Sequence, residues 1–190
     1  MPGSPSTVYK MVKHQRRSIR LPEFDYSQPG VYFVTICVHG GECRLGEIQG
    51  GRMVLNQVGE IAHEAWVWLD EKFIALDVDV FCIMPNHAHT ILTINEPSRG
   101  DLHGRGYLQS APTTGEVKKK PLGRLVGAYK THSTVLINKQ LGTPGEKFWQ
   151  RNYYERVIRN EREYNAVWEY IENNPANWRE DENYYEGGLD

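Results

Sequence analysis

The segment from residue 75 to residue 94 constrains the fold most strongly, because it predicts two β-strands joined by a turn of only two residues. The strands are expected over residues 75–84 and 87–94, with Pro85-Asn86 between them. Proline fixes its own backbone angle and lacks the N–H group that a central strand needs, so this dipeptide indicates a tight turn. A connection this short favours antiparallel pairing of the two strands.

The second strand begins with a pair of histidines separated by one small residue. Side chains alternate between the two faces of a strand, so His87 and His89 point to one face while Ala88 points into the core. Two imidazoles placed in this way can bind one metal ion at the start of the strand, where a substrate could reach it. Seven histidines in 190 residues make a chance His-x-His pair common, so a surface strand with two solvated histidines is the alternative.

A helix is expected after Asn160, near the C-terminus. Asn160 suits the N-cap position, Glu163 follows it as in a capping box, and Pro175 ends the helix. Helical spacing predicts a buried stripe made of Tyr164, Val167, Trp168 and Ile171.

Tyr170 lies outside that stripe. At about 100° per residue it projects roughly 110° from the centre of the stripe, and Asn174 lies one turn further along on the same side. A phenol and a carboxamide are therefore stacked on one edge of the helix, free to face something other than the core. The alternative is an unremarkable half-exposed tyrosine, one of eleven in the chain.

These residues carry a resemblance to a known family. The segment Met84-Pro85-Asn86-His87-Ala88-His89 resembles the His-hydrophobic-His motif of the HUH single-tyrosine transposases, and Tyr170-x-x-x-Asn174-Pro175 resembles their nucleophile helix. The likeness is greatest to the REP-associated tyrosine transposase branch, which is related to bacterial insertion-sequence transposases. Residues 16–22, 30–37 and 148–155 agree with that branch, so the resemblance spans most of residues 16–178.

The remaining pattern predicts an α+β fold, a ferredoxin-like or RRM-like sandwich with a central antiparallel sheet and helices packed on it. Strands are expected over 30–38 and 148–158, with a hairpin over 44–56 that turns at Gly50-Gly51. Helices are expected over 56–73 and 122–140, the second ended by Gly142. The resemblance implies the same arrangement, with the histidines on a middle strand and the tyrosine helix nearby.

Length and composition agree with a single domain over residues 23–178, which the resemblance implies is transposase-like. It is flanked by a basic arm at 1–22 and an acidic tail at 179–190, and a polar segment rich in Gly and Pro at 96–121 is expected to be a flexible loop. No apolar run is long enough to span a bilayer and no secretory signal is apparent, so no membrane partner is expected. Three cysteines without metal-ligand spacing suit reduced thiols in a cytoplasm. The resemblance implies a bacterial protein that associates with the nucleoid.

The formal net charge is only −2, but the charges are unevenly distributed, with a basic arm at 1–22 and an acidic tail at 179–190. A basic arm of this kind can contact phosphates, so the distribution points to a nucleic-acid partner. A second basic region follows the loop, and aromatic and basic residues alternate around residue 150, a composition that suits stacking of unpaired bases as well as core packing. The candidate DNA-binding residues are Lys10, Lys13, Arg16, Arg17, Arg20, Lys118, Lys119, Lys120, Arg124, Lys130, Arg151 and Tyr153.

The resemblance implies metal-dependent cleavage and rejoining of single-stranded DNA through a 5′-phosphotyrosine intermediate. Tyr170 would be the nucleophile, and His87, His89 and Asn174 would bind a divalent metal ion, Mg²⁺ or Mn²⁺ if the family is a guide, although imidazole also suits zinc or nickel. Insertion-sequence members usually carry glutamine at the position of Asn174, which puts direct metal contact by the shorter side chain in doubt. Tyr129, beside a lysine, is the rival nucleophile.

Several points stay open at this level. Hairpin-forming repeats are the substrate that the resemblance implies, and the protein could be a homodimer that supplies the tyrosine in cis or in trans. A catalytically silent module that binds single-stranded nucleic acid is the alternative function, and a metal-dependent hydrolase that uses water is a third. Nothing in the spacing assigns a role to Glu155, Glu169 or Glu172.

Overall fold

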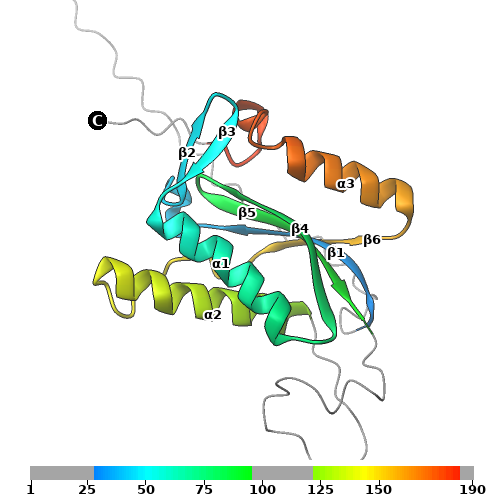
Figure 1. Cartoon of the computed structure of the whole chain (residues 1–190), viewed down its shortest axis with the longest axis horizontal. Helices are drawn as coiled ribbons and strands as arrows, with labels where there is room; N and C mark the ends of the chain where they lie inside the picture. Colours follow the sequence, from blue (N-terminus) through cyan, green and yellow to red (C-terminus); the bar gives the residue numbers. More distant parts are fainter. Residues whose placement is uncertain (1–27, 96–121, 185–190) are drawn as a thin grey trace, which may run out of the picture.

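The protein is built around a four-stranded antiparallel sheet in the order β4-β5-β1-β6 (Figure 1). The computed structural model describes residues 28–95 and 122–184. The strands are β1 (Gly30–Cys37), β4 (Leu76–Met84), β5 (His87–Ile94) and β6 (Tyr154–Ile158). β1 lies in the middle and pairs with β5 on one side and β6 on the other.

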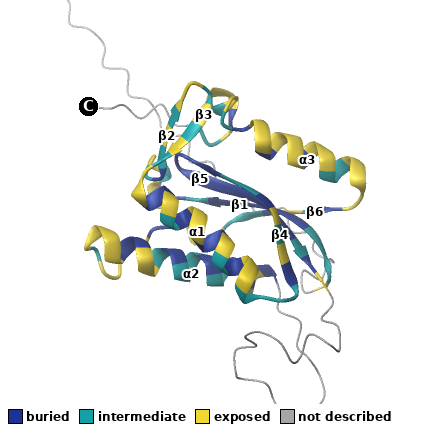
Figure 2. Cartoon of the chain, in the orientation of Figure 1, coloured by how far each residue is buried: buried dark blue, intermediate teal, exposed yellow. Residues whose placement is uncertain are grey.

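Helices cover both faces of this sheet. Helices α1 (Gln57–Lys72) and α2 (Leu122–Leu141) pack on one face, and α3 (Glu161–Asn173) lies on the other (Figure 1). The buried side chains of β1 alternate accordingly: Tyr32 and Val34 belong to the large core under α1 and α2, and Phe33 belongs to a smaller cluster under α3. Figure 2 shows that α3 is exposed along most of its length, in contrast to the buried strands beneath it.

A small hairpin stands beside the main sheet, at the end of α3 (Figure 1). It consists of β2 (Gly46–Gln49) and β3 (Arg52–Leu55), joined by Gly50 and Gly51. Both glycines have positive φ angles, 58° and 75°, which glycine adopts without the steric cost that other residues have in a two-residue hairpin turn.

The expected fold class is confirmed. Without the hairpin and the C-terminal helix α3, the strands and α-helices follow the order β-α-β-β-α-β, and the sheet order β4-β5-β1-β6 is that of a ferredoxin-like sandwich. The hairpin at Gly50-Gly51, the strand pair around Pro85-Asn86 and the three helices all form, within two residues of the expected ends. Among the described residues, no helix combines the length and apolar character that crossing a membrane requires.

Two expectations about local structure are wrong. The last strand covers only Tyr154–Ile158, because Phe148 and Trp149 are buried in the large core instead, and Trp149 meets the sheet through a single bridge to Val38. Trp168 is 42% exposed, since α3 rests on the sheet through Val167 and Ile171 while Trp168 lies on the solvent side of that contact.

The predicted arm at 1–22 and loop at 96–121 lie outside the described residues. The predicted acidic tail, 179–190, is described as far as residue 184, and it begins inside a short 3₁₀ helix, η3 (Trp178–Glu180), that follows α3.

Candidate active site

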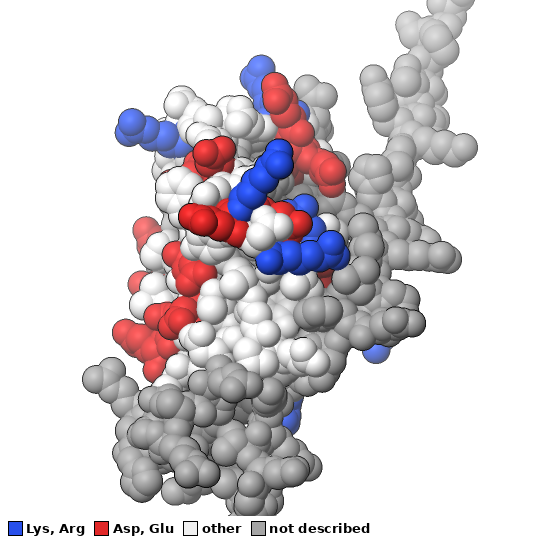
Figure 3. Space-filling view, turned by 90° about the vertical axis from the view of Figure 1, so that its right-hand side faces the viewer, with Lys and Arg blue, Asp and Glu red and all other residues white. Residues whose placement is uncertain are grey.

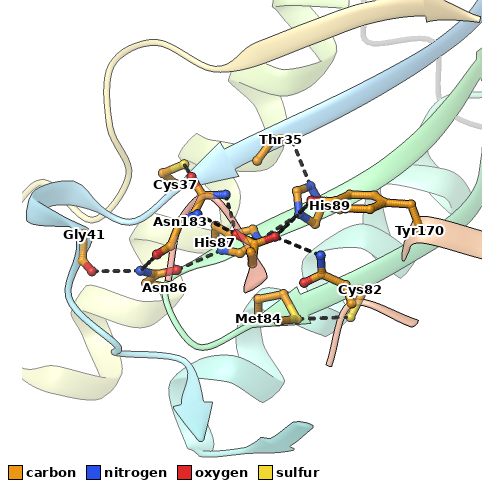
Figure 4. A network of polar contacts seen from close by, with 12 residues as sticks. Thr35, Cys37, Gly41, Cys82, Met84, Asn86, His87, His89, Tyr170 and Asn183 are labelled. Carbon is orange, nitrogen blue, oxygen red and sulfur yellow. Dashed lines mark hydrogen bonds and ion pairs between the residues drawn. The ribbon is translucent and has the colours of Figure 1, made fainter. Parts of the chain in front are cut away.

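The two histidines of β5 lie side by side beneath the C-terminal half of α3. The Nε2 atoms of His87 and His89 are 2.8 Å apart, and the two side chains are 0% and 2% exposed (Figure 4). Ala88 points to the opposite face, into the large core, as alternation predicts. The alternative of two solvated surface histidines is therefore wrong.

Hydrogen bonds orient both imidazole rings. Asn86 donates through Nδ2 to the carbonyl oxygens of Gly41 and Asn183, which directs its Oδ1 toward His87 Nδ1 at 2.8 Å. Because Oδ1 can only accept, His87 Nδ1 carries the proton, and in the neutral ring Nε2 keeps its lone pair. The Nδ1 atom of His89 forms its hydrogen bond with Thr35 Oγ1, also at 2.8 Å.

This orientation has a consequence for the space between the rings. Because His87 Nε2 faces His89 Nε2 across only 2.8 Å, a proton or a metal cation has to lie between the two nitrogens. Hydrogen bonds to the outer nitrogens, with the inner nitrogens left to a cation, are the usual arrangement of metal-binding histidines.

A carboxylate completes the group from the segment after α3. Asp181 follows η3, is buried, and places its two oxygens 3.9 Å from His87 Nε2 and 3.7 Å from His89 Nε2. Among the described residues, one ligand atom from each of these three side chains lies within 4.8 Å of the others, a spacing that could hold a metal ion.

Asp181 is held as an anion. Burial alone would raise the pKa of its carboxyl group, but hydrogen bonding with His89, the charge of His87, and hydrogen bonds from Asn174 and Asn183 hold that pKa well below its usual range. The Oδ1 atom accepts from the backbone N–H of Asn183 at 2.6 Å and from its Nδ2 at 3.0 Å. The site therefore contains one buried negative charge beside two imidazoles.

Tyr170 reaches this group from α3 of the same chain. Its hydroxyl donates to Asp181 Oδ2 at 2.9 Å and lies 3.3 Å from His89 Nε2. The ring packs edge-on against Phe33 and is 43% exposed. The phenol oxygen is thus beside the histidines, while part of the ring faces solvent.

Asn174 stands one turn beyond Tyr170, as the helical spacing predicts. It is buried and donates through Nδ2 to Asp181 Oδ2 at 2.9 Å. Its amide oxygen is also buried and has no hydrogen-bond partner among the described residues. A buried carbonyl oxygen without a partner is unfavourable, so the residues present suit a hard cation that this oxygen could help to bind.

The rival nucleophile, Tyr129, is remote from this group. It is fully buried under α1, stacks on Trp66 with ring centroids 3.7 Å apart, and donates to the carbonyl oxygen of Ala62. Burial raises the pKa of the Tyr129 phenol well above its usual value. Glu155 pairs opposite Val34, on the face of the sheet away from the histidines, and Glu169 and Glu172 are exposed on α3.

The candidate DNA-binding residues are spread over the chain. Arg124 and Arg151 are exposed, whereas Lys130 donates to the backbone carbonyls of residues 150–152 and lies over the ring of Tyr153, which packs against the large core. The structure thus gives Lys130 and Tyr153 packing contacts. The other eight candidates lie outside the described residues: Lys10, Lys13, Arg16, Arg17, Arg20, Lys118, Lys119 and Lys120.

Figure 3 shows the face of the molecule at the right-hand side of Figure 1. Basic and acidic side chains lie close together in its upper half, and acidic side chains follow its left edge. On this face, the described residues form no continuous basic surface.

Sequence reasoning placed His87, His89, Tyr170 and Asn174 in one site, and the structure brings these four side chains together. It missed Asp181, which it assigned to the acidic tail at 179–190. The available signal was Trp178, a large apolar residue just before the acidic run, which indicates that the chain is still packed against the domain there.

Comparison with known proteins places this geometry in context. No protein-family model matches the chain. An uncharacterised protein from Haemophilus influenzae is 36% identical over 181 residues, covering 94% of this chain and 98% of that protein. Among solved structures, a REP-associated tyrosine transposase bound to a REP hairpin superimposes with a TM-score of 0.52 at 16% identity, covering 88% of this chain and 74% of that one.

The high identity over nearly the full length of both chains establishes common family membership with the first of these proteins, and the structural match establishes the fold. The chain therefore belongs to the same family as the Haemophilus influenzae protein, and its fold is that of a REP-associated tyrosine transposase, as the sequence resemblance predicted.

Proposed function

We propose that this protein cleaves and rejoins single-stranded DNA through a covalent bond between Tyr170 and a 5′ phosphate. The observation that carries the proposal is the position of the Tyr170 hydroxyl, 3.3 Å from His89 Nε2 and 2.9 Å from Asp181 Oδ2. A nucleophile beside a candidate cation site, with its ring partly exposed, is the arrangement that covalent phosphoryl transfer requires.

His87, His89 and Asp181 would hold the divalent ion, with the amide oxygen of Asn174 available to it. Carboxylate and amide oxygens suit Mg²⁺ or Mn²⁺, the ions expected from the family resemblance, and imidazole does not by itself exclude zinc. When bound, the ion would supply Lewis-acid polarisation of an oxygen of the scissile phosphodiester.

The chemical step exchanges one phosphodiester bond for another. The phenol oxygen of Tyr170 forms a bond to phosphorus as the bond from phosphorus to the 3′ oxygen breaks. The phenol gives up its proton and the departing 3′ oxygen gains one, so the products are a 5′-phosphotyrosine and a free 3′ hydroxyl. Asp181 holds the hydroxyl of Tyr170 in place before attack through the 2.9 Å hydrogen bond.

Rejoining is the reverse reaction. A 3′ hydroxyl attacks the phosphotyrosine and the tyrosine leaves, so the number and type of bonds are conserved. No nucleotide cofactor is needed to supply energy. Because α3 delivers Tyr170 to the histidines of its own chain, one subunit contains the complete constellation, which supports a tyrosine that acts in cis even if the protein forms a homodimer.

The proposed substrate is a single-stranded DNA that contains hairpin-forming repeats. Support comes from the solved structure with the same fold, which is bound to a REP hairpin. The basic arm at 1–22 and Lys118–Lys120 would contribute phosphate contacts whose strength decreases with salt.

The test is incubation of the protein with end-labelled hairpin DNA carrying single-stranded flanks, in Mn²⁺ or Mg²⁺, followed by denaturing electrophoresis. We expect a labelled protein–DNA adduct that survives denaturation in the wild type and in the Tyr129→Phe variant and that is absent in Tyr170→Phe. Free cleaved DNA without an adduct would instead support hydrolysis by water. DNA retention without cleavage would support the silent binding module.

A further inference from the structure

A second cavity lies beside the candidate active site, between the β2–β3 hairpin and the segment that follows α3. Its volume is about 560 Å³, within the range of small-ligand pockets. The turn glycines Gly50 and Gly51 form one wall, and residues 175–180 with Tyr184 form the other.

The inner wall of this cavity is aromatic. Trp178 and Tyr184 pack edge to face with ring centroids 5.2 Å apart, and Trp178 is only half-buried. The Trp178 ring also lies 5.9 Å from the ring of His87. Trp178 therefore both lines the cavity and lies next to the histidine pair.

A different cavity, of about 660 Å³, opens on the Tyr170 side of the site and is lined by Phe33, Tyr154, Arg156 and Tyr170 among others. Glu180 contributes to both cavities, and Asp181 lines the cavity at Tyr170. A DNA strand whose phosphate lies at Tyr170 must continue in both directions, and the two cavities give it a place on each side of the histidine group.

The composition of the cavity at Trp178 favours a base over a phosphate. Its charged lining residues are one arginine, Arg179, and one glutamate, Glu180, so their formal charges cancel. An unpaired base is uncharged, has a flat face that can stack on an indole, and has polar edges that backbone groups can contact. The open hairpin turn of Gly50 and Gly51 carries no side chain that would fill the space.

We infer that this cavity binds an unpaired base next to the cleaved phosphate, stacked on Trp178 and flanked by Tyr184. The inference rests on the proposed function, because it is that function which brings single-stranded DNA to the site. Trp178 and Tyr184 would then hold the DNA strand on the side of the histidine pair away from Tyr170.

The test measures the contribution of the bases separately from that of the phosphates. Fluorescence anisotropy in a metal-free buffer compares binding of a labelled oligothymidylate, dT12, with an abasic oligonucleotide of the same length, using the full chain with Tyr170→Phe to prevent chemistry. Trp178→Ala is expected to weaken dT12 binding by about 5- to 160-fold, the range for loss of one base stack, and to change abasic binding by less than twofold.

Matched variants separate stacking from loss of structure. Trp168→Ala removes an equally large ring from the solvent side of α3 and should leave binding of both oligonucleotides unchanged. Tyr184→Ala, which removes the ring packed against Trp178, should weaken dT12 binding selectively as well, and thermal denaturation reports whether each variant is folded. Equal loss of dT12 and abasic binding in folded Trp178→Ala and Tyr184→Ala variants would overturn the inference.

Photocrosslinking gives an independent readout. A dT12 analogue in which 5-iodouracil replaces thymine should crosslink to Trp178 or Tyr184, and crosslinks confined to other residues would contradict the proposed position. If the Trp178 and Tyr184 variants lose base binding selectively but the wild type forms no covalent adduct in the cleavage test, the cavity is assigned and the proposed cleavage is refuted. If the wild type forms the adduct but these variants show no selective loss of base binding, the cleavage stands and the base-binding cavity is refuted.

Discussion

The Asp181→Asn substitution tests the candidate metal centre most directly. The change keeps the size of the side chain and removes the one buried negative charge beside His87 and His89. We expect Mn²⁺ binding to become at least about 100-fold weaker, which corresponds to about 2.7 kcal/mol.

The magnitude follows from the geometry. The carboxylate oxygens lie 3.7–3.9 Å from the two Nε2 atoms, and a pair of unit charges about 4 Å apart interacts by about 4 kcal/mol at an effective dielectric constant of about 20. A divalent ion held near those nitrogens would interact more strongly still. Part of this gain is offset by the desolvation of the ion and the carboxylate, so 100-fold is a lower estimate.

The substitution also affects stability, which must be measured separately. Each carboxylate oxygen of Asp181 accepts hydrogen bonds, from Tyr170 and Asn174 at Oδ2 and from two groups of Asn183 at Oδ1. In the variant, an amide NH₂ faces two of these donors whichever way it turns. The free energy of unfolding should fall by about 1–3 kcal/mol for each donor left unpaired.

The assay is isothermal titration calorimetry with Mn²⁺ on the folded protein, with urea denaturation in EDTA to report stability. Glu180→Gln is the matched control, because it removes the same charge from an exposed neighbouring side chain and should change Mn²⁺ affinity less than threefold. If folded Asp181→Asn binds Mn²⁺ within threefold of the wild type while His87→Ala does not, Asp181 is no metal ligand and the reasoning fails.

Three further predictions address the nucleophile, the histidine support and the fold. Tyr129→Phe should keep full adduct formation and lose about 0.5–1.5 kcal/mol of stability in urea, since it removes only one buried hydrogen bond, and loss of the adduct would restore Tyr129 as a nucleophile. Asn86→Ala should weaken Mn²⁺ binding by about 10- to 100-fold in calorimetry by releasing the His87 ring, and unchanged affinity would show that this hydrogen bond does not orient the ligand. Gly59→Ala should cost about 1–3 kcal/mol in urea denaturation, because its Cβ would meet the backbone oxygen of Leu45, and wild-type stability would show that α1 shifts freely.

The sequence predicted most of the fold because its signals are local. A two-residue turn at Pro85-Asn86, two positive-φ glycines at Gly50-Gly51 and an N-cap at Asn160 each depend on a few adjacent residues. The predictions that Trp168 is buried and that a strand covers 148–158 were wrong, because hydrophobicity alone does not show which surface covers a residue. Phe148 and Trp149 pack into the core without being part of the sheet.

For the site, alternation along β5 and the helical period of α3 determined that His87 and His89 share a face and that Tyr170 and Asn174 share an edge. Only the tertiary structure decided that these two surfaces meet and that Asp181 lies between them, 94 residues from His87 in the sequence. Strand and helix periods set the direction of side chains within one element. Contacts between elements depend on how the whole core packs, and the segment after α3 has no period that could have predicted the position of its carboxylate.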